Sequence, residues 1–266
     1  MLISDWLFGV LSGTAASILI FTIYNHTPEA WLQEWNEKPG DPGYRKSRRL
    51  TLSAFYVLFP LLLLTNCGIF FFTESSLRAV ALVLYLLFGT LLFIGDLLNR
   101  ILPNQYLLAV LGVWIAERTT QGILRVSPPF LLPLLPEWPD RLVGAVAIPL
   151  LLWGTALLTS RIKGGEQLGF GDIKLLSLCG FITGGSGSFL ILFGAVLFTL
   201  FAVPISFLLR RTRSNRQLPS HEHTSRQTET DSIDEPHFAE DPRFIPMGPA
   251  ICLSFFLILL LSRAIL

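Results

Sequence analysis

Charged side chains are scarce in this chain of 266 residues. Asp, Glu, Lys and Arg together make up 15% of the sequence, whereas hydrophobic residues make up 52%. A soluble globular domain carries about 25% charged residues, and several apolar runs here approach the roughly 20 residues that a helix needs to cross a bilayer. The composition therefore predicts a membrane protein. No basic patch with interleaved aromatic residues occurs, so the sequence does not indicate nucleic-acid binding.

The motifs of several common site classes are also missing. The three cysteines, Cys67, Cys179 and Cys252, form no CxxC pair, so nothing in the sequence indicates a structural zinc site. Neither the zinc-protease spacing HExxH nor the serine-hydrolase motif GxSxG occurs. We therefore expect no bound metal and interpret the cysteines as small side chains packed in helices. The apolar start, 1–21, lacks a basic leading region and contains Asp5, which favours a retained anchor over a cleaved signal.

Eight apolar segments are expected to form helices, and we interpret all eight as membrane spans of an all-α polytopic protein. Segments 106–116 and 173–183 are shorter than a full span, so each must extend further, tilt or cross only part of the bilayer. The expected segments are 3–24, 52–72, 79–94, 106–116, 142–160, 173–183, 189–209 and 245–261.

The distribution of Lys and Arg predicts the orientation of these spans. If the N-terminus lies outside and the eight spans alternate, most of the 20 basic residues fall in cytoplasmic segments. This arrangement also puts the C-terminus outside. The basic residues left on the outer side are Arg78, Arg118, Arg125, Arg141 and Arg263.

Two aspartates lie at the expected cytoplasmic ends of apolar segments. Carboxylates within or at the ends of membrane spans are costly and are treated as functional candidates. Each also has a structural interpretation that the sequence leaves open. Asp96 could pair with Arg100, four residues on, and Asp172 could cap the helix that follows it.

Asp96 and Asp172 together suit a reaction that neither carboxyl could perform alone. In peptide hydrolysis by aspartates, an ionised carboxylate takes a proton from water while a protonated partner donates one to the carbonyl oxygen. Two carboxyls held close together share one proton, because like charges disfavour double ionisation. The pair therefore predicts a membrane aspartyl protease.

Three motifs make the chain resemble the type IV prepilin peptidase family, the bacterial GxGD membrane aspartyl proteases. Asp96 is followed by Leu102-Pro103-Asn104, the second motif is Gly169-Phe170-Gly171-Asp172-Ile173-Lys174-Leu175-Leu176, and the third is Pro246-Met247-Gly248-Pro249. The residues that match the family and support the two aspartates are Pro103, Asn104, Gly169, Gly171, Lys174, Pro246, Gly248 and Pro249.

The resemblance implies that Asp96 and Asp172 are the catalytic residues of a leader peptidase in the bacterial inner membrane. Such an enzyme removes the basic leader from type IV prepilins or type II secretion pseudopilins at the cytoplasmic face. It uses no metal for proteolysis, and many members also methylate the new N-terminus with S-adenosylmethionine. No residue of this chain could be assigned to that second activity.

The resemblance also implies a domain organisation. It consists of a first helix at 1–24, a cytoplasmic loop at 25–50, a membrane peptidase core at 51–209, a linker at 210–243 and the last helix at 244–266. The loop departs from the family, because many members carry two CxxC pairs there and this chain has no cysteine in it. Segment 210–243 matches nothing in the family; its polar composition predicts a flexible cytoplasmic linker.

Two other interpretations stay open at this point. One is a GxGD protease of the presenilin or signal-peptide-peptidase kind, which would cut within a membrane helix. The other is a transporter or assembly scaffold that uses paired acidic residues for a coupled ion. The type of substrate distinguishes the two proteases.

Overall fold

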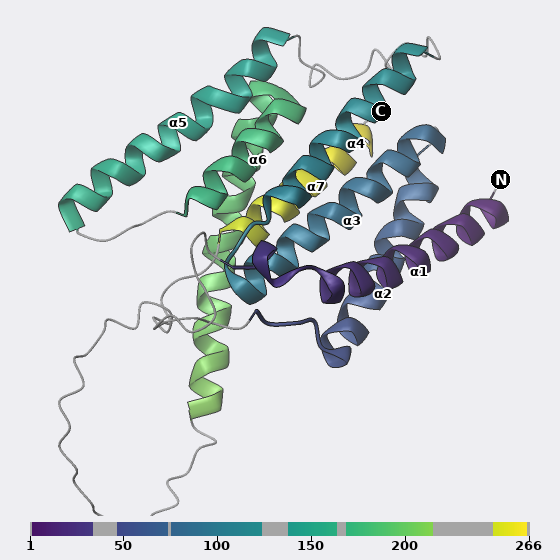
Figure 1. Ribbon diagram of the computed structural model, residues 1–266, viewed down its shortest axis with the longest axis horizontal. Coiled ribbons are helices and arrows are strands. Elements are labelled where there is room, and N and C mark those ends of the chain that lie inside the picture. Colours follow the sequence, from purple (N-terminus) through teal and green to yellow (C-terminus); the bar gives the residue numbers. More distant parts are fainter. Residues whose placement is uncertain are drawn as a thin grey trace, which may run out of the picture. The chain divides into compact units, whose positions relative to one another are not determined.

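The computed structural model describes residues 2–33, 47–73, 76–123, 138–163, 169–214 and 247–264, and all regular structure in these ranges is helical (Figure 1). The chain divides into two compact units, Met1–Ala195 with Pro246–Leu266, and Val196–Ile245. The elements are α1 (Leu2–His26), the short 3-10 helix η1 (Glu29–Trp31), α2 (Leu52–Phe72), α3 (Ser76–Asn99), α4 (Asn104–Ile123), α5 (Trp138–Lys163), α6 (Phe170–Ser214) and α7 (Gly248–Ala264).

Five of the described helices are long and apolar enough to cross a membrane. The all-helical class and the multi-pass character predicted from the composition are therefore confirmed. α7 has a shorter apolar part, Gly248–Leu261. The five spans are Trp6–His26, Leu52–Phe72, Ser76–Asn99, Trp138–Leu158 and Phe170–Phe201.

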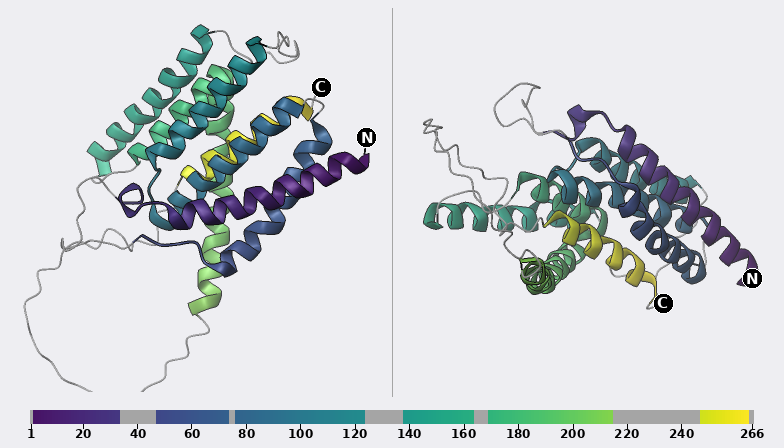
Figure 2. Two further views of the ribbon diagram at one scale, coloured as in Figure 1. Left: turned by 45° about the vertical axis from the view of Figure 1, so that its right-hand side comes forward. Right: turned by 90° about the horizontal axis from the view of Figure 1, so that it is seen from below.

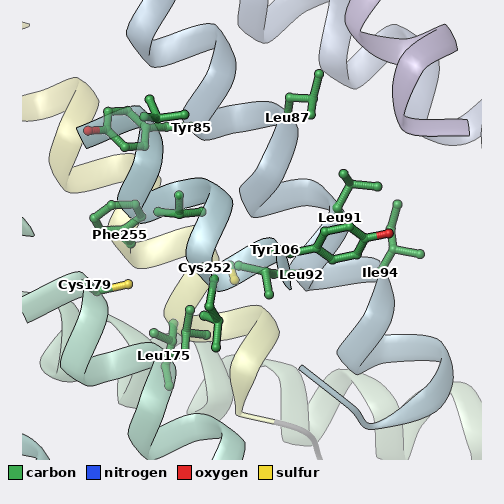
Figure 3. Packing of buried hydrophobic residues seen from close by; sticks show 14 of the residues in the cluster. Tyr85, Leu87, Leu91, Leu92, Ile94, Tyr106, Leu175, Cys179, Cys252 and Phe255 are labelled. Carbon is green, nitrogen blue, oxygen red and sulfur yellow. The ribbon is translucent and has the colours of Figure 1, made fainter. Parts of the chain in front are cut away.

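In the first unit, α1 packs along α2, and α3 packs against both α4 and α7 (Figure 2). The buried side chains of α3, α4, α6 and α7 meet in one cluster. Figure 3 shows part of it, with Leu91 and Ile94 of α3 beside Tyr106 of α4, and with Leu175 of α6 and Phe255 of α7 in the same cluster. All three cysteines are free and buried in helices, as predicted. This packing joins the helices that carry the two aspartates and the third motif.

α4 is longer than the sequence predicted. The expected segment was 106–116, whereas the helix continues to Ile123. Its polar end is stabilised by side-chain hydrogen bonds. Glu117 accepts from the Tyr85 hydroxyl at 3.1 Å and from Gln121 Nε2 at 3.2 Å. Apolar periodicity cannot reveal such a polar extension, because the partner on α3 is known only from the fold.

The two segments predicted at 173–183 and 189–209 are joined without a loop. They form α6, which is interrupted by the single non-helical residue Gly184, at φ 83° and ψ −176°. This φ lies in the region that favours glycine. A Cβ built at Gly180 would lie 2.8 Å from Ser188 Oγ, although eight residues of straight helix span about 12 Å. The chain therefore bends sharply at Gly184. The helix also runs on to Ser214, into the start of the predicted linker 210–243, and residues 215–246 lie outside the described part.

α5 and α6 meet where two glycines allow their backbones to touch. A Cβ at Gly144 would collide with the carbonyl oxygen of Gly180, and a Cβ at Gly180 with that of Gly144. The Ser177 hydroxyl donates to Ala145 O in the same region. The close approach needs a glycine on each helix, because a Cβ at either position would collide with backbone atoms. Backbone atoms cannot move aside as the end of a flexible side chain can.

We expect Gly180→Ala to lower the free energy of unfolding by about 1–3 kcal/mol, since overpacking a tight contact costs that much. The matched control is Gly154→Ala in α5, where a Cβ has no neighbour within 4 Å. That control should be neutral or slightly stabilising, because alanine favours helix more than glycine does. Thermal unfolding of the purified variants in detergent measures both. Equal unfolding midpoints for Gly180→Ala and wild type would contradict the tight contact.

Candidate active site

Asp96 lies in the last turn of α3 and is 6% exposed. The helix ends three residues later, at Asn99, and Arg100 follows with φ 57°. The Arg100 N–H donates to Asp96 O at 2.9 Å, which closes the final turn. The helix thus continues past the expected end at residue 94 and carries the buried Asp96 in its last turn.

The Arg100 side chain, which the sequence offered as a partner for Asp96, is exposed and lies within electrostatic range of the Asp96 carboxyl. This charge interaction does not fill the space around the buried carboxyl oxygen. The Gly248 backbone lies beside the Asp96 carboxyl, but within the described part of the chain Asp96 Oδ2 is buried without a hydrogen-bond partner. A buried acceptor without a partner costs about 1–3 kcal/mol. Such an atom is well placed to accept a hydrogen bond from a water or a substrate group.

Asp172 is the third residue of α6, so it is not the helix cap considered from the sequence. Its N–H donates to Gly169 O at 3.1 Å, and the helix begins at Phe170. A carboxylate in the first turn is favoured by the partial positive charge of the helix N-terminus. The Asp172 side chain is half-buried.

Gly248, the first residue of α7, brings the two aspartates together. A Cβ built on this buried glycine would lie 2.6 Å from Asp96 Oδ2 and 3.3 Å from Asp172 Oδ1. The two carboxyl oxygens are therefore no further apart than the sum of these distances. Pro249 follows in the first turn of α7, where its missing N–H costs no helical hydrogen bond. Three segments far apart in sequence thus meet at one point.

The residues 83–203 match the sequence model of the type IV leader peptidase family. This range covers just under half of the chain and contains both Asp96 and Asp172. The resemblance inferred from the motifs is confirmed over this range. No curated protein and no solved structure matches the chain. The match supports a protease of the leader peptidase kind with several membrane-spanning helices.

Two glycines next to the aspartates, Gly95 and Gly171, make room for the segment that joins α3 to α4. A Cβ at Gly171 would lie 3.1 Å from Leu102 Cδ1, and one at Gly95 would lie 3.3 Å from Pro103 Cδ. Half-buried Leu102 and buried Pro103 therefore fit against α6 and α3, because each helix presents a glycine. Pro246 lies outside the described residues.

Lys174 and Asn104 connect the first two motifs by their side chains. Lys174 Nζ donates to Asn104 Oδ1 at 3.4 Å and lies 4.8 Å from the centre of the Phe170 ring. Asn104 is the first residue of α4. These contacts tie the start of α6 to the start of α4, although Lys174 itself remains exposed.

Asn99, three residues after Asp96, was not predicted from the sequence to have a role. Its Nδ2 donates to the Tyr24 hydroxyl at 2.7 Å and to Arg48 O at 3.3 Å, and its Oδ1 accepts from the Arg48 N–H at 2.7 Å. The C-terminal end of α3, three residues after Asp96, is thereby fixed to α1 and to the segment before α2. The only signal in the sequence is an amide at the end of an apolar run, which is too common to be informative.

We expect Asn99→Ala to lower the free energy of unfolding by about 1–3 kcal/mol, because it leaves the buried Tyr24 hydroxyl without this donor. Proteolysis should also slow, since α3 positions Asp96. Unfolding midpoint and initial cleavage rate are the measurements. Thr119→Ala is the control, because its exposed hydroxyl bonds only to Ile115 O of its own helix. If Asn99→Ala kept the wild-type unfolding midpoint and cleavage rate, the hydrogen bonds of Asn99 to Tyr24 and Arg48 would be dispensable.

No group of three or more His, Cys, Asp or Glu side chains suited to a metal ion occurs among the described residues. The predicted cysteine-free loop, 25–50, is described only at its two ends. There, Asn25 Oδ1 accepts from the Leu50 N–H at 2.9 Å, and Arg49 donates to Thr27 O at 2.7 Å. Residues 34–46 lie outside the described part.

Proposed function

We propose that this protein is a leader peptidase in which Asp96 and Asp172 form the catalytic pair. The substrates proposed are type IV prepilins or the pseudopilins of type II secretion. The observation that carries the proposal is the position of both carboxyl groups beside Gly248, at 2.6 Å and 3.3 Å from the Cβ that this residue lacks. The family match over residues 83–203 supports the protease class.

In the proposed mechanism the two carboxyl groups share one proton. The ionised carboxylate takes a proton from a water molecule, which attacks the peptide carbonyl, while the protonated partner donates to the carbonyl oxygen. The tetrahedral intermediate then collapses as the leaving amine receives a proton from the pair. The buried Asp96 Oδ2, without a partner in the described chain, supports a position for the water or the carbonyl oxygen at this carboxyl.

The two glycines of the GxGD motif differ in what they contribute. The space beside Gly171 is filled by Leu102, so this glycine serves packing. Gly169 is exposed, and among the described residues a Cβ there would have only Asp172 Oδ2, at 3.6 Å, as a neighbour. We therefore assign to Gly169 the close backbone approach of an extended substrate.

We further propose the topology that the basic residues indicate, with eight spans, both termini outside and the catalytic pair at the cytoplasmic face of the bacterial inner membrane. The break of α6 at Gly184 supports counting it as two of those spans. Proteolysis is proposed to need no metal. Methylation of the new N-terminus with S-adenosylmethionine is a separate activity, and no step of the mechanism above depends on it.

Co-expression with two kinds of substrate tests the proposed function. A prepilin should be shortened by the length of its leader on a gel. A single-span membrane protein that lacks a leader should stay intact. Cleavage of the second protein within its membrane helix, with the prepilin left whole, would instead favour the presenilin-like interpretation. If neither substrate is cut although the chain is inserted in the membrane, the result would favour the transporter or scaffold.

A further inference from the structure

A cluster of polar side chains lies at the other end of α3 from the catalytic pair. Arg78 is in the first turns of α3, and Asp96 is 18 residues further on, which corresponds to about 27 Å along a helix. The hydrocarbon core of a bilayer is about 30 Å thick. If α3 spans the membrane and Asp96 lies near one face, the cluster around Arg78 lies at the level of the lipid headgroups on the opposite face.

Two hydrogen-bond donors in this cluster are buried and have no partner among the residues that the structure describes. They are Trp114 Nε1 and Arg118 Nε. The two residues are four apart on α4, so their side chains share one face of that helix. Trp114 is 8% exposed. Both groups can only donate, so a ligand that satisfies them must offer acceptor atoms.

The surroundings of these donors are rich in positive charge. The Arg141 guanidinium lies over the Trp114 ring, 5.2 Å from its centre, and Arg78 is within electrostatic range of Arg118. Arg141 donates to the carbonyl oxygens of Phe181 and Ile182, at 3.3 Å and 3.0 Å, which holds it against the bend of α6. Three arginines from three helices thus converge on the unsatisfied donors.

The acidic residues nearby offset part of this charge, because Glu117 lies within electrostatic range of Arg78 and Asp140 of Arg141. Three arginines against two carboxylates leave a surplus of one positive charge. Both acids also accept hydrogen bonds from neutral groups. The two Glu117 oxygens accept from the Tyr85 hydroxyl and from Gln121, and Asp140 Oδ2 accepts from the Gly185 N–H at 3.2 Å. Gln121 Oε1 accepts from Arg118 NH1 at 3.4 Å, whereas the buried Arg118 Nε has no partner in the described part of the chain. The donors and the surplus of positive charge together favour an anionic ligand with oxygen acceptors.

We propose that Trp114 and Arg118, with Arg78 and Arg141 around them, form a binding site for a phosphate group. The level of the site relative to the membrane favours the phosphodiester of a phospholipid headgroup, and free phosphate is the other source of the same chemistry. The site stabilises the packing of α3, α4, α5 and the α6 bend. It does not use the aspartates, so it is independent of the proposed proteolysis.

Ligand titrations of the full-length protein in a neutral detergent test this site. Phosphatidylglycerol and inorganic phosphate are added separately at constant ionic strength, and thermal unfolding is followed at each concentration. Wild type should show a saturable rise in unfolding midpoint. A rise with the lipid alone identifies the headgroup as the source, and a rise with both identifies a site for phosphate in general.

Two variants remove the donors separately. Arg118→Gln removes the charge together with Nε–H and should weaken the apparent affinity about tenfold, as expected for a lost charge-assisted hydrogen bond. Trp114→Phe keeps an aromatic ring beneath Arg141 but loses Nε1–H, and should weaken the affinity severalfold. Trp114→Phe also tests the site on its own if Arg118→Gln does not fold. Arg161→Gln is the control, since Arg161 is exposed and lies near the far end of α5.

The control should bind as wild type does. The proposal is overturned if wild type shows no saturable stabilisation by either ligand. It is also overturned if Trp114→Phe, or Arg118→Gln where that variant folds, keeps the wild-type apparent affinity.

Discussion

Asn in place of either Asp96 or Asp172 is expected to reduce leader cleavage by a factor on the order of 10³ or more. Asparagine has nearly the shape of aspartate but can neither take a proton from water nor deliver one to the carbonyl oxygen. Because the proposed mechanism needs both carboxyl groups to share one proton, each substitution alone should remove most of the activity. Cleavage of a purified prepilin with enzyme in excess measures the chemical step for each variant.

Glu29→Gln provides the matched control for these variants, because it neutralises a carboxylate in η1 that belongs to none of the motifs. It should cleave as wild type does. Unfolding midpoints close to the wild-type value would show that both asparagine variants are folded. Cleavage by a folded Asp96→Asn or Asp172→Asn variant at more than a tenth of the wild-type rate would exclude that residue from catalysis.

A single methyl group at residue 248 is expected to inactivate the site almost as severely. In Gly248→Ala the new Cβ would lie 2.6 Å from Asp96 Oδ2 and 2.9 Å from Asp96 Cγ. The Asp96 side chain or the start of α7 must therefore shift. A displacement of about 1 Å in a catalytic group can cost a factor of about 10² in rate, so we expect a loss of that size.

The control for Gly248→Ala is Gly89→Ala, in the same helix as Asp96, where a Cβ meets nothing within 4 Å. The control should keep wild-type activity. This result would distinguish crowding of the two carboxyl groups from a general effect of alanine in a helix. Initial cleavage rates and unfolding midpoints are compared for both variants. An unchanged rate in Gly248→Ala would mean that this residue does not lie between the two carboxyl groups.

The sequence allowed both aspartates to be named because the chemistry and the flanking motifs agree. It could not show that Gly248 lies between the two carboxyl groups, because that contact joins three helices and depends on packing. The same holds for Gly171. Its place beside Asp172 in the motif does not reveal that Leu102 fills the space next to it. Local patterns identify reactive groups, but only the fold shows which atoms fill the space around them.

The apolar segments were located correctly, and segment 52–72 agrees with α2 at both ends, whereas the ends of other segments differ from the helices. α4 extends beyond its apolar part because Tyr85 and Gln121 satisfy Glu117. The break in α6 needs one residue rather than a loop, because Gly184 adopts a positive φ. In the first case a side-chain hydrogen bond decides where the helix ends, and in the second a backbone conformation decides where it breaks. The spacing of hydrophobic residues reveals neither.

The mass of a co-expressed prepilin's N-terminal peptide tests the central claim most directly. With wild type, we predict a peptide that begins directly after the leader, and its mass also reports whether a methyl group has been added. With Asp172→Asn, the leader should remain attached. A mature N-terminus produced equally by wild type and by Asp172→Asn would contradict the account.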